Sequence, residues 1–131
     1  MNWSDIEREI ESAQAPIDSI RVKFINEIHE HTKRNVIVYY SGWLHSSHPA
    51  NSINDMDKNG FLQSVHGMDT DKGLDLVLHT PGGSIAATES IVNYLKSKFG
   101  NDIRAIVPQL AMSAGTMLCF SSKAIVMGKH S

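Results

Sequence analysis

LHTPGG at residues 78–83 and AMSAGT at residues 111–116 each follow a short apolar run and open a segment with helical spacing. The two runs, 74–78 and 103–107, are dominated by Leu, Ile, Val and Ala, as is typical of strands buried in a parallel sheet. A third run, 124–127, follows the second helical segment. Strands that alternate with helices in this way predict a parallel sheet with right-handed βα crossovers. The fold class predicted from the sequence is therefore α/β.

The sequence before these segments predicts one more strand of the sheet. Residues 35–40 are β-branched and aromatic and predict a first strand, which is followed by a polar loop over 41–54 and a short helix over 56–66. Apolar residues three and four positions apart predict helices over 84–99 and 113–120. Each predicted strand after the first is thus preceded by a helix.

A helical segment precedes the sheet. It consists of a helix that begins at Ser4, an interruption at Pro16, and a second, amphipathic helix over residues 17–31. We therefore divide the chain into an N-terminal helical segment, 1–34, and an α/β domain, 35–131. We expect this domain to be incomplete at its C-terminus, because the sequence ends just after a predicted strand.

Composition excludes several classes of function. The 131 residues carry a formal net charge of −2, which gives no reason to expect nucleic acid as a partner. No apolar stretch is long enough to span a membrane, and the polar N-terminus lacks the apolar core of a signal peptide. The single cysteine, Cys119, cannot form an internal disulfide and suits a buried position. We expect a cytoplasmic protein with no membrane association.

The residues that can carry chemistry lie in the two opening segments. Ligands of parallel α/β sheets bind beyond the carboxyl ends of the strands, where both segments are predicted to lie. Gly82 and Gly83 can offer backbone N–H donors, and Ser113 offers a hydroxyl beside the N–H of Ala114. A nucleophile next to N–H donors is what attack on a carbonyl requires. Taken separately, each segment is also consistent with a tight strand-to-helix turn or an ordinary N-cap serine.

The same residues resemble a known superfamily. Residues 75–83 are similar to the strand and glycine turn of the ClpP/crotonase fold, and residues 107–116 are similar to its nucleophile segment. Residues 124–131 resemble the strand and bend that follow. Within this fold, the segments are most similar to the serine dehydrogenase proteinase family, which is related to signal peptide peptidase A.

The resemblance implies a serine peptidase. It makes Ser113 the nucleophile and assigns the oxyanion hole to the N–H groups of Gly82, Gly83 and Ala114. The substrate is then a peptide or protein that binds in extended form beside the glycine turn, as an added strand. The resemblance also implies a homo-oligomer that needs no cofactor.

The general base is the feature that the sequence does not supply. In the resembled families, a histidine or a lysine serves as base, at positions that fall beyond Ser131. His79 and His130 are the candidates within the chain, although the resemblance gives neither of them this role. A neighbouring subunit is another source of the base. Two alternatives therefore remain: a non-catalytic binding or assembly module of the same fold, and a crotonase-like acyl-CoA enzyme.

Two further motifs bear on ligands. Asp55, Asp57 and Asn59 imitate the first half of a calcium-binding EF-hand loop, but the twelfth position is His66 instead of glutamate. The seven histidines show no spacing typical of a zinc site, so we expect no metal. An aromatic group near the end of the first strand is either a core edge or part of a peptide-binding wall: Tyr39, Tyr40 and Trp43.

Overall fold

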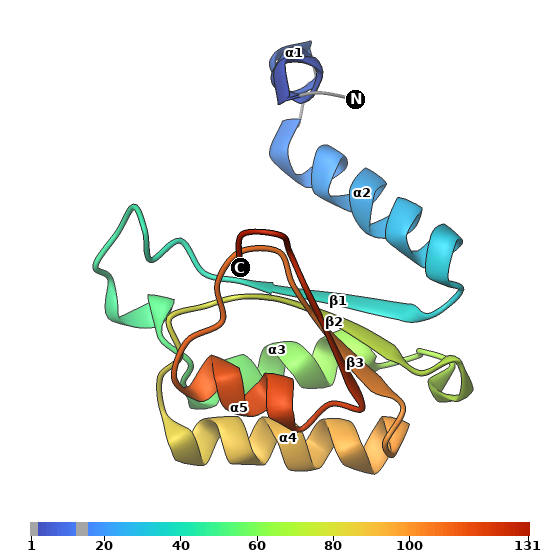
Figure 1. Ribbon diagram of the computed structural model, residues 1–131, viewed down its shortest axis with the longest axis vertical. Helices are drawn as coiled ribbons and strands as arrows, with labels where there is room; N and C mark the ends of the chain where they lie inside the picture. The colour runs from blue at the N-terminus through green and yellow to red at the C-terminus, as the bar shows by residue number, and fades with distance from the viewer. Residues whose placement is uncertain (1–2, 13–15) are drawn as a thin grey trace. The chain divides into compact units, whose positions relative to one another are not determined.

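Four parallel strands form one sheet in the order β1-β2-β3-β4 (Figure 1). The strands are β1 (Asn35–Tyr40), β2 (Leu74–His79), β3 (Ile103–Val107) and β4 (Ala124–Met127). Each strand pairs with the one before it in the chain, and the register places Tyr40 opposite His79 and Val77 opposite Ile106. The α/β fold class predicted from the sequence is confirmed.

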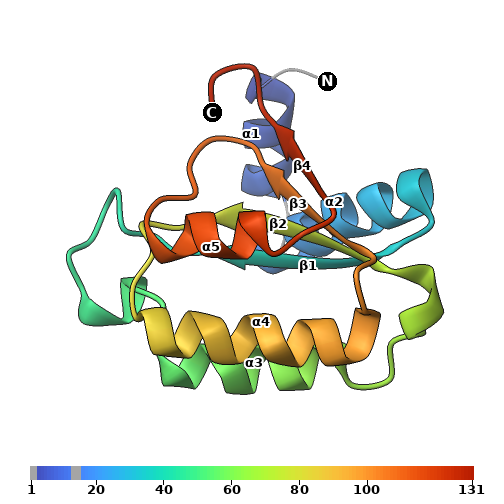
Figure 2. The ribbon, with the colours of Figure 1, turned by 60° about the horizontal axis from the view of Figure 1, so that its bottom comes forward.

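Three helices connect the strands and lie on one face of the sheet (Figures 1 and 2). They are α3 (Asp55–Val65), α4 (Ile85–Phe99) and α5 (Ala114–Phe120), and two short 3₁₀ helices, η1 (Pro49–Asn51) and η2 (Thr70–Lys72), flank α3. Strands added in sequence order through crossovers of one hand place all their helices on the same side. As Figure 2 shows, the three helices begin at the edge of the sheet where β1, β2 and β3 end.

The core lies between this face of the sheet and the helices. Its largest side chains that are almost completely buried are those of Ile53, Leu74, Leu76, Leu78, Ile91, Leu95 and Leu118. The leucines of β2 alternate with residues that face the other side of the sheet, as strand geometry requires. Ile53 is the one member of this group that does not lie in a strand or an α-helix, because it comes from the polar segment predicted as a loop.

The remaining helices belong to a separate unit. The chain divides at residues 33 and 34, and the computed structural model describes residues 3–12 and 16–131. The N-terminal unit contains α1 (Trp3–Ser12) and α2 (Pro16–Thr32), which are joined by an ion pair of 2.5 Å between Lys23 Nζ and Glu9 Oε1. No helix in the described ranges has the length and apolarity needed to cross a membrane.

The segment that imitates an EF-hand is helical. Asp57 lies in the first turn of α3, where its carboxylate accepts the backbone N–H of Asn54 at 2.8 Å and the hydroxyl of Tyr39 at 3.1 Å. The Asn54 side chain in turn accepts the N–H of Met56 at 2.9 Å, which completes a capping box. Burial, followed by the neighbouring Asp57 charge, raises the pKa of Tyr39 far above its ordinary value. Within the described residues, no three His, Cys, Asp or Glu side chains are grouped to hold a metal ion.

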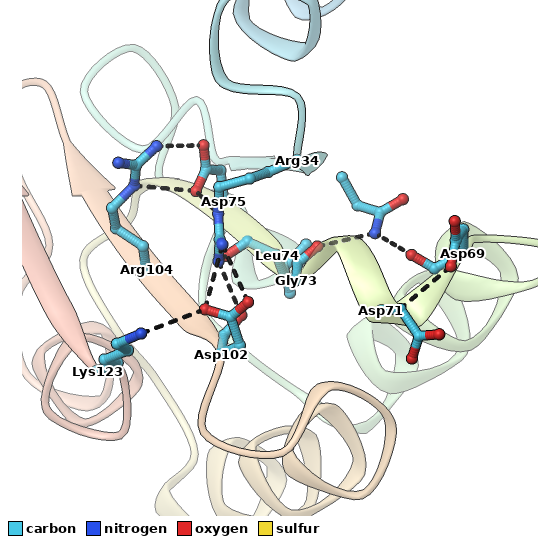
Figure 3. Close-up of polar contacts among 10 residues, drawn as sticks. Arg34, Asp69, Asp71, Gly73, Leu74, Asp75, Asp102, Arg104 and Lys123 are labelled. Carbon is cyan, nitrogen blue, oxygen red and sulfur yellow. Dashed lines mark hydrogen bonds and ion pairs between the residues drawn. The ribbon is translucent and has the colours of Figure 1, made fainter.

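The amino ends of the strands are held by one arginine, Arg34 (Figure 3). Its Nε donates to Asp75 Oδ1 at 2.8 Å, and its Nη1 donates to both carboxylate oxygens of Asp102 at 3.1 Å. Its Nη2 donates to the backbone carbonyls of Leu74 at 3.2 Å and Asp102 at 2.8 Å. The guanidinium therefore ties the residue before β1 to the starts of β2 and β3.

Asp75 lies at the centre of this cluster and is completely buried. Arg104 of β3 binds the same carboxylate from the other side, at 3.0 Å from Nε to Oδ1 and 2.6 Å from Nη2 to Oδ2. The hydrogen bond from Arg34 is the main reason that the pKa of Asp102 is lower than its ordinary value. A buried carboxylate with two arginine partners fixes the register of neighbouring strands from the end opposite the glycine turn.

Candidate active site

The two segments singled out in the sequence lie side by side, beyond the ends of β2 and β3. The Thr80 N–H donates to the Leu110 carbonyl at 3.1 Å, and the Met112 N–H donates to the Thr80 carbonyl at 3.0 Å. These bonds form an isolated parallel bridge between Thr80 and Ala111. The glycine turn and the segment that carries Ser113 are thus joined directly through their backbones.

Gly82 is the point of closest approach between them. A Cβ atom placed on Gly82 would lie 2.5 Å from the Met112 carbonyl oxygen, 2.7 Å from the Ala114 nitrogen and 2.7 Å from the Ser113 Cβ. Its φ of 93° also lies in a region that side chains rarely adopt. A glycine is required here because the serine segment occupies the space of a side chain.

Ser113 has an unusual backbone conformation, with φ 53° and ψ −122°. Among the described residues, Lys33 is the only other non-glycine with a positive φ. The Ser113 side chain is exposed, and although it stands at the N-cap position of α5, it makes no capping hydrogen bond. An ordinary N-cap serine has extended backbone and caps its helix, so this interpretation of Ser113 is excluded. Strained conformations of this kind are concentrated at functional sites.

Two backbone N–H groups next to the contact between Gly82 and Ser113 are unpaired among the described residues. In the part of the chain that the structure describes, the N–H groups of Gly83 and Ala114 have no hydrogen-bond acceptor within the protein. The N–H of Gly82 differs, because it donates to the Thr80 hydroxyl oxygen at 3.1 Å. The turn thus uses the Gly82 N–H internally, which does not favour Gly82 as a donor to a ligand, whereas the N–H groups of Gly83 and Ala114 are not used in this way.

Ile53 closes the other side of the glycine turn. Its N–H donates to the Gly82 carbonyl at 2.8 Å, and its carbonyl accepts the N–H of Ser84 at 2.8 Å. A Cβ on Gly83 would collide with the Ile53 backbone nitrogen and carbonyl oxygen. One edge of the turn is thus already paired, and the N–H of Gly83 is not used in this pairing.

His79 does not reach the serine. Its ring stacks on Tyr40, with centroids 5.2 Å apart, and on Trp43, with centroids 6.3 Å apart. Side chains alternate along β2, so His79 faces the side of the sheet opposite to Thr80, which contacts the serine segment. Among the described residues, none forms a hydrogen bond with the Ser113 hydroxyl. His79 as general base has no support in these contacts.

His130 lies in an exposed turn after β4. This turn is held at Gly128, whose N–H donates to the Val107 carbonyl at 2.8 Å, and a Cβ there would collide with the Pro108 carbonyl. No hydrogen bond joins His130 to Ser113 in the described part of the chain.

The aromatic group predicted near the first strand divides between two environments. Tyr39 belongs to the core, where its ring stacks on Phe61 with centroids 5.6 Å apart. Tyr40 is 56% exposed and packs with Trp43 around His79. The core interpretation holds for Tyr39, and the peptide-wall interpretation stays open for the other two residues.

Two residues that position the site were not identified from the sequence. Thr80 stands two residues before Gly82, a spacing at which a threonine hydroxyl commonly accepts a backbone N–H in a turn. Ile53 is an isolated apolar residue at the end of a polar segment, which indicates burial of that end. The Ile53 signal is weak alone, because the burial of this residue depends on pairing with Gly83, which is distant in the sequence.

Comparison with known proteins agrees with this geometry. The family of ClpP-like SDH-type serine proteinases matches residues 17–131. Two uncharacterized proteins of Methanocaldococcus jannaschii, MJ0137 and MJ1495, are 35% and 32% identical to the chain over 74 residues. The aligned region is 56% of this chain, but only 26% and 25% of the respective relatives, so the match spans about a quarter of their length. The parallel α/β sheet and the extent of the family match lead to one conclusion: the chain belongs to the ClpP-like SDH-type serine proteinase family.

Proposed function

We propose that this chain carries the nucleophile and the oxyanion hole of a serine peptidase. Membership of a serine proteinase family supports a peptidase-type function in general. The observation that carries the specific assignment is the strained, exposed Ser113 packed against Gly82, together with the N–H groups of the next residues, Gly83 and Ala114, which have no acceptor among the described residues. The proposed substrate is a peptide or protein bound in extended form.

In the proposed reaction, Ser113 Oγ attacks the carbonyl carbon of the scissile peptide bond. The new Oγ–C bond forms as the carbonyl π electrons move onto oxygen, and the Oγ proton passes to a general base. The N–H groups of Gly83 and Ala114 donate to the resulting oxyanion. The intermediate then collapses: the C–N bond breaks, the amine leaves with the proton, and water hydrolyses the acyl-serine in a second round.

The two proposed donors are held in place by different elements of the fold. Gly83 is fixed by its pairing with Ile53, whereas Ala114 is the first residue of α5 and has an N–H that no helical carbonyl can accept. Both amides are therefore oriented before substrate arrives. Fixed donors stabilise developing charge without reorganisation during the reaction, and removal of one such donor typically costs about 10²–10³ in rate.

The general base is proposed to come from outside the contacts described above, either from further polypeptide or from a neighbouring subunit of a homo-oligomer. A serine hydroxyl without a base is a weak nucleophile at neutral pH. The test therefore uses the full chain in its native oligomeric state and a reagent that reports nucleophilicity directly.

The experiment is reaction with a fluorophosphonate, followed by digestion and mass mapping. The proposal predicts an adduct on Ser113 that is lost in Ser113→Ala and retained in Ser97→Ala, which removes an exposed hydroxyl from α4. An intact protein that takes up no label on Ser113 would reject its role as nucleophile. Titration with coenzyme A separates the alternative acyl-CoA enzyme, since only that function predicts saturable binding of the nucleotide.

A further inference from the structure

We infer that Thr80 is a positioning residue that sets the distance between the oxyanion donors and Ser113. This inference rests on the proposed function, because it concerns the same reaction. Thr80 is completely buried, lies one residue beyond β2, and has no place for contact with substrate. Its effect must therefore pass through the residues that it holds.

Three hydrogen bonds converge on Thr80, and they join both turns of the site. Its N–H and carbonyl bond to Leu110 and Met112, at 3.1 Å and 3.0 Å, in the segment that leads into Ser113. Its hydroxyl oxygen accepts the Gly82 N–H at 3.1 Å, in the glycine turn. Among the described residues, Thr80 is the one whose own atoms bond to both segments.

The two branches of the side chain act on different elements. The Cγ2 methyl group packs against α5, since a Cβ placed on Gly115 would lie 2.6 Å from it. The hydroxyl accepts the Gly82 N–H and thereby fixes the Pro81–Gly82 peptide. The Gly83 N–H belongs to the next peptide, whose Gly82 carbonyl accepts the Ile53 N–H at 2.8 Å. Thr80 therefore holds one side of Gly82 and Ile53 holds the other, and the direction of the Gly83 N–H depends on both.

The chemistry gives the hydroxyl a specific consequence. Without the Thr80 hydroxyl, the buried Gly82 N–H would lose its acceptor, and an unsatisfied buried N–H favours rotation of the Pro81–Gly82 peptide toward another acceptor. The Gly83 amide would then move out of its orientation relative to Ala114. Small displacements of positioning groups lower rates without abolishing binding, and a shift of about 1 Å can cost about a hundredfold.

The test compares Thr80→Val, which removes the hydroxyl at constant volume, with Thr80→Ser, which restores it. Thr88→Val is the matched control, because Thr88 is also completely buried and also uses its hydroxyl in one hydrogen bond, to the Ser84 carbonyl at 2.8 Å. For fluorophosphonate labelling of Ser113, we expect Thr80→Val to lower the maximal rate constant about tenfold to a hundredfold, with little change in half-saturation. We expect Thr80→Ser to recover most of this rate and Thr88→Val to label as the wild type does, although both valine variants lose thermal stability.

The inference is overturned if Thr80→Val labels like Thr88→Val, or if Thr80→Ser is as slow as Thr80→Val. A wild-type chain that takes no label would refute the proposed function, and amide NMR then decides the inference independently. Thr80→Val should accelerate hydrogen exchange at Gly82 about tenfold or more and shift the amide resonances of Gly83 and Ala114. Resonances of Gly83 and Ala114 that match the wild type would overturn it.

Discussion

Gly82 packs directly against Ser113, since a Cβ on Gly82 would lie 2.7 Å from the Cβ of Ser113. The glycine turn and the serine segment are far apart in the sequence but form a single unit at the edge of the sheet. This contact makes the glycine a requirement of packing as well as of backbone conformation, and it places the serine beside the donors of the turn.

Gly82→Ala should therefore disrupt the site. The new methyl group meets backbone atoms on the serine segment and requires a left-handed φ, so we expect a loss of at least about 2 kcal/mol in the free energy of unfolding. Ser113 should also lose its reactivity toward a fluorophosphonate. Urea denaturation and labelling measure the two effects.

Gly60→Ala is the matched control for this substitution. Gly60 lies inside α3 with open space around its Cβ position, so the change should raise stability by about 0.5–1 kcal/mol and leave labelling intact. Equal stability losses for the two variants would show that the Gly82–Ser113 contact has no special role.

The sequence predicted the sheet and its connections because their signals are local. Apolar runs, the alternation of strands with helices, and the turns at residues 78–83 and 111–116 are each visible in a short window. The ends of the strands, and the segments that follow them, can be read from these windows. The occupation of the Gly82 N–H could not be predicted in the same way, because a turn with two glycines offers two donors and only the side-chain rotamer of Thr80 distinguishes them.

The structural roles of Ile53 and Arg34 could not be predicted from the sequence for a related reason. Ile53 stands in a segment rich in Ser, His and Asn, where local composition predicts a loop, and its burial depends on pairing with Gly83. Arg34 stands at the predicted domain boundary, where a charged residue is ordinarily solvated, but five of its donor contacts reach Asp75, Asp102 and Leu74. Tertiary contacts of this kind leave no periodic pattern.

Asp75→Asn should destabilise the sheet strongly. The substitution removes the buried charge that two arginines share and leaves their guanidinium groups without compensation, which typically costs about 3–5 kcal/mol. The urea midpoint should fall accordingly. Asp18→Asn, which removes an exposed partner of Arg21, should leave the midpoint unchanged; similar shifts for both variants would mean that the Asp75 cluster adds no more than a surface pair.

Tyr39 should make stability depend on alkaline pH. Its folded-state pKa is raised, mainly by burial, so the hydroxyl stays protonated while the unfolded chain ionises near the ordinary value of 10. Its contribution is complete below that value and is lost as the pH rises above it. Wild-type stability should therefore fall more steeply than that of Tyr39→Phe between about pH 9 and pH 11. Parallel curves in chemical denaturation would contradict this interpretation.

Cys119 should behave as a core residue instead of a reactive thiol. It is buried, and burial raises the pKa of its thiol above the ordinary value. At pH 8, a thiol reagent should therefore modify the native protein at least about a hundredfold more slowly than the protein in urea. Rapid modification of the folded chain would show that α5 opens or that the thiol is accessible.

The most direct measurement of the central claim is a crystal structure of the chain after reaction with a fluorophosphonate. We expect phosphorus bonded to Ser113 Oγ, and one phosphonyl oxygen about 2.7–3.1 Å from the nitrogens of both Gly83 and Ala114. The Gly82 N–H should remain on the Thr80 hydroxyl. An adduct on Ser113 whose oxygens point away from these two amides would contradict the proposed oxyanion hole.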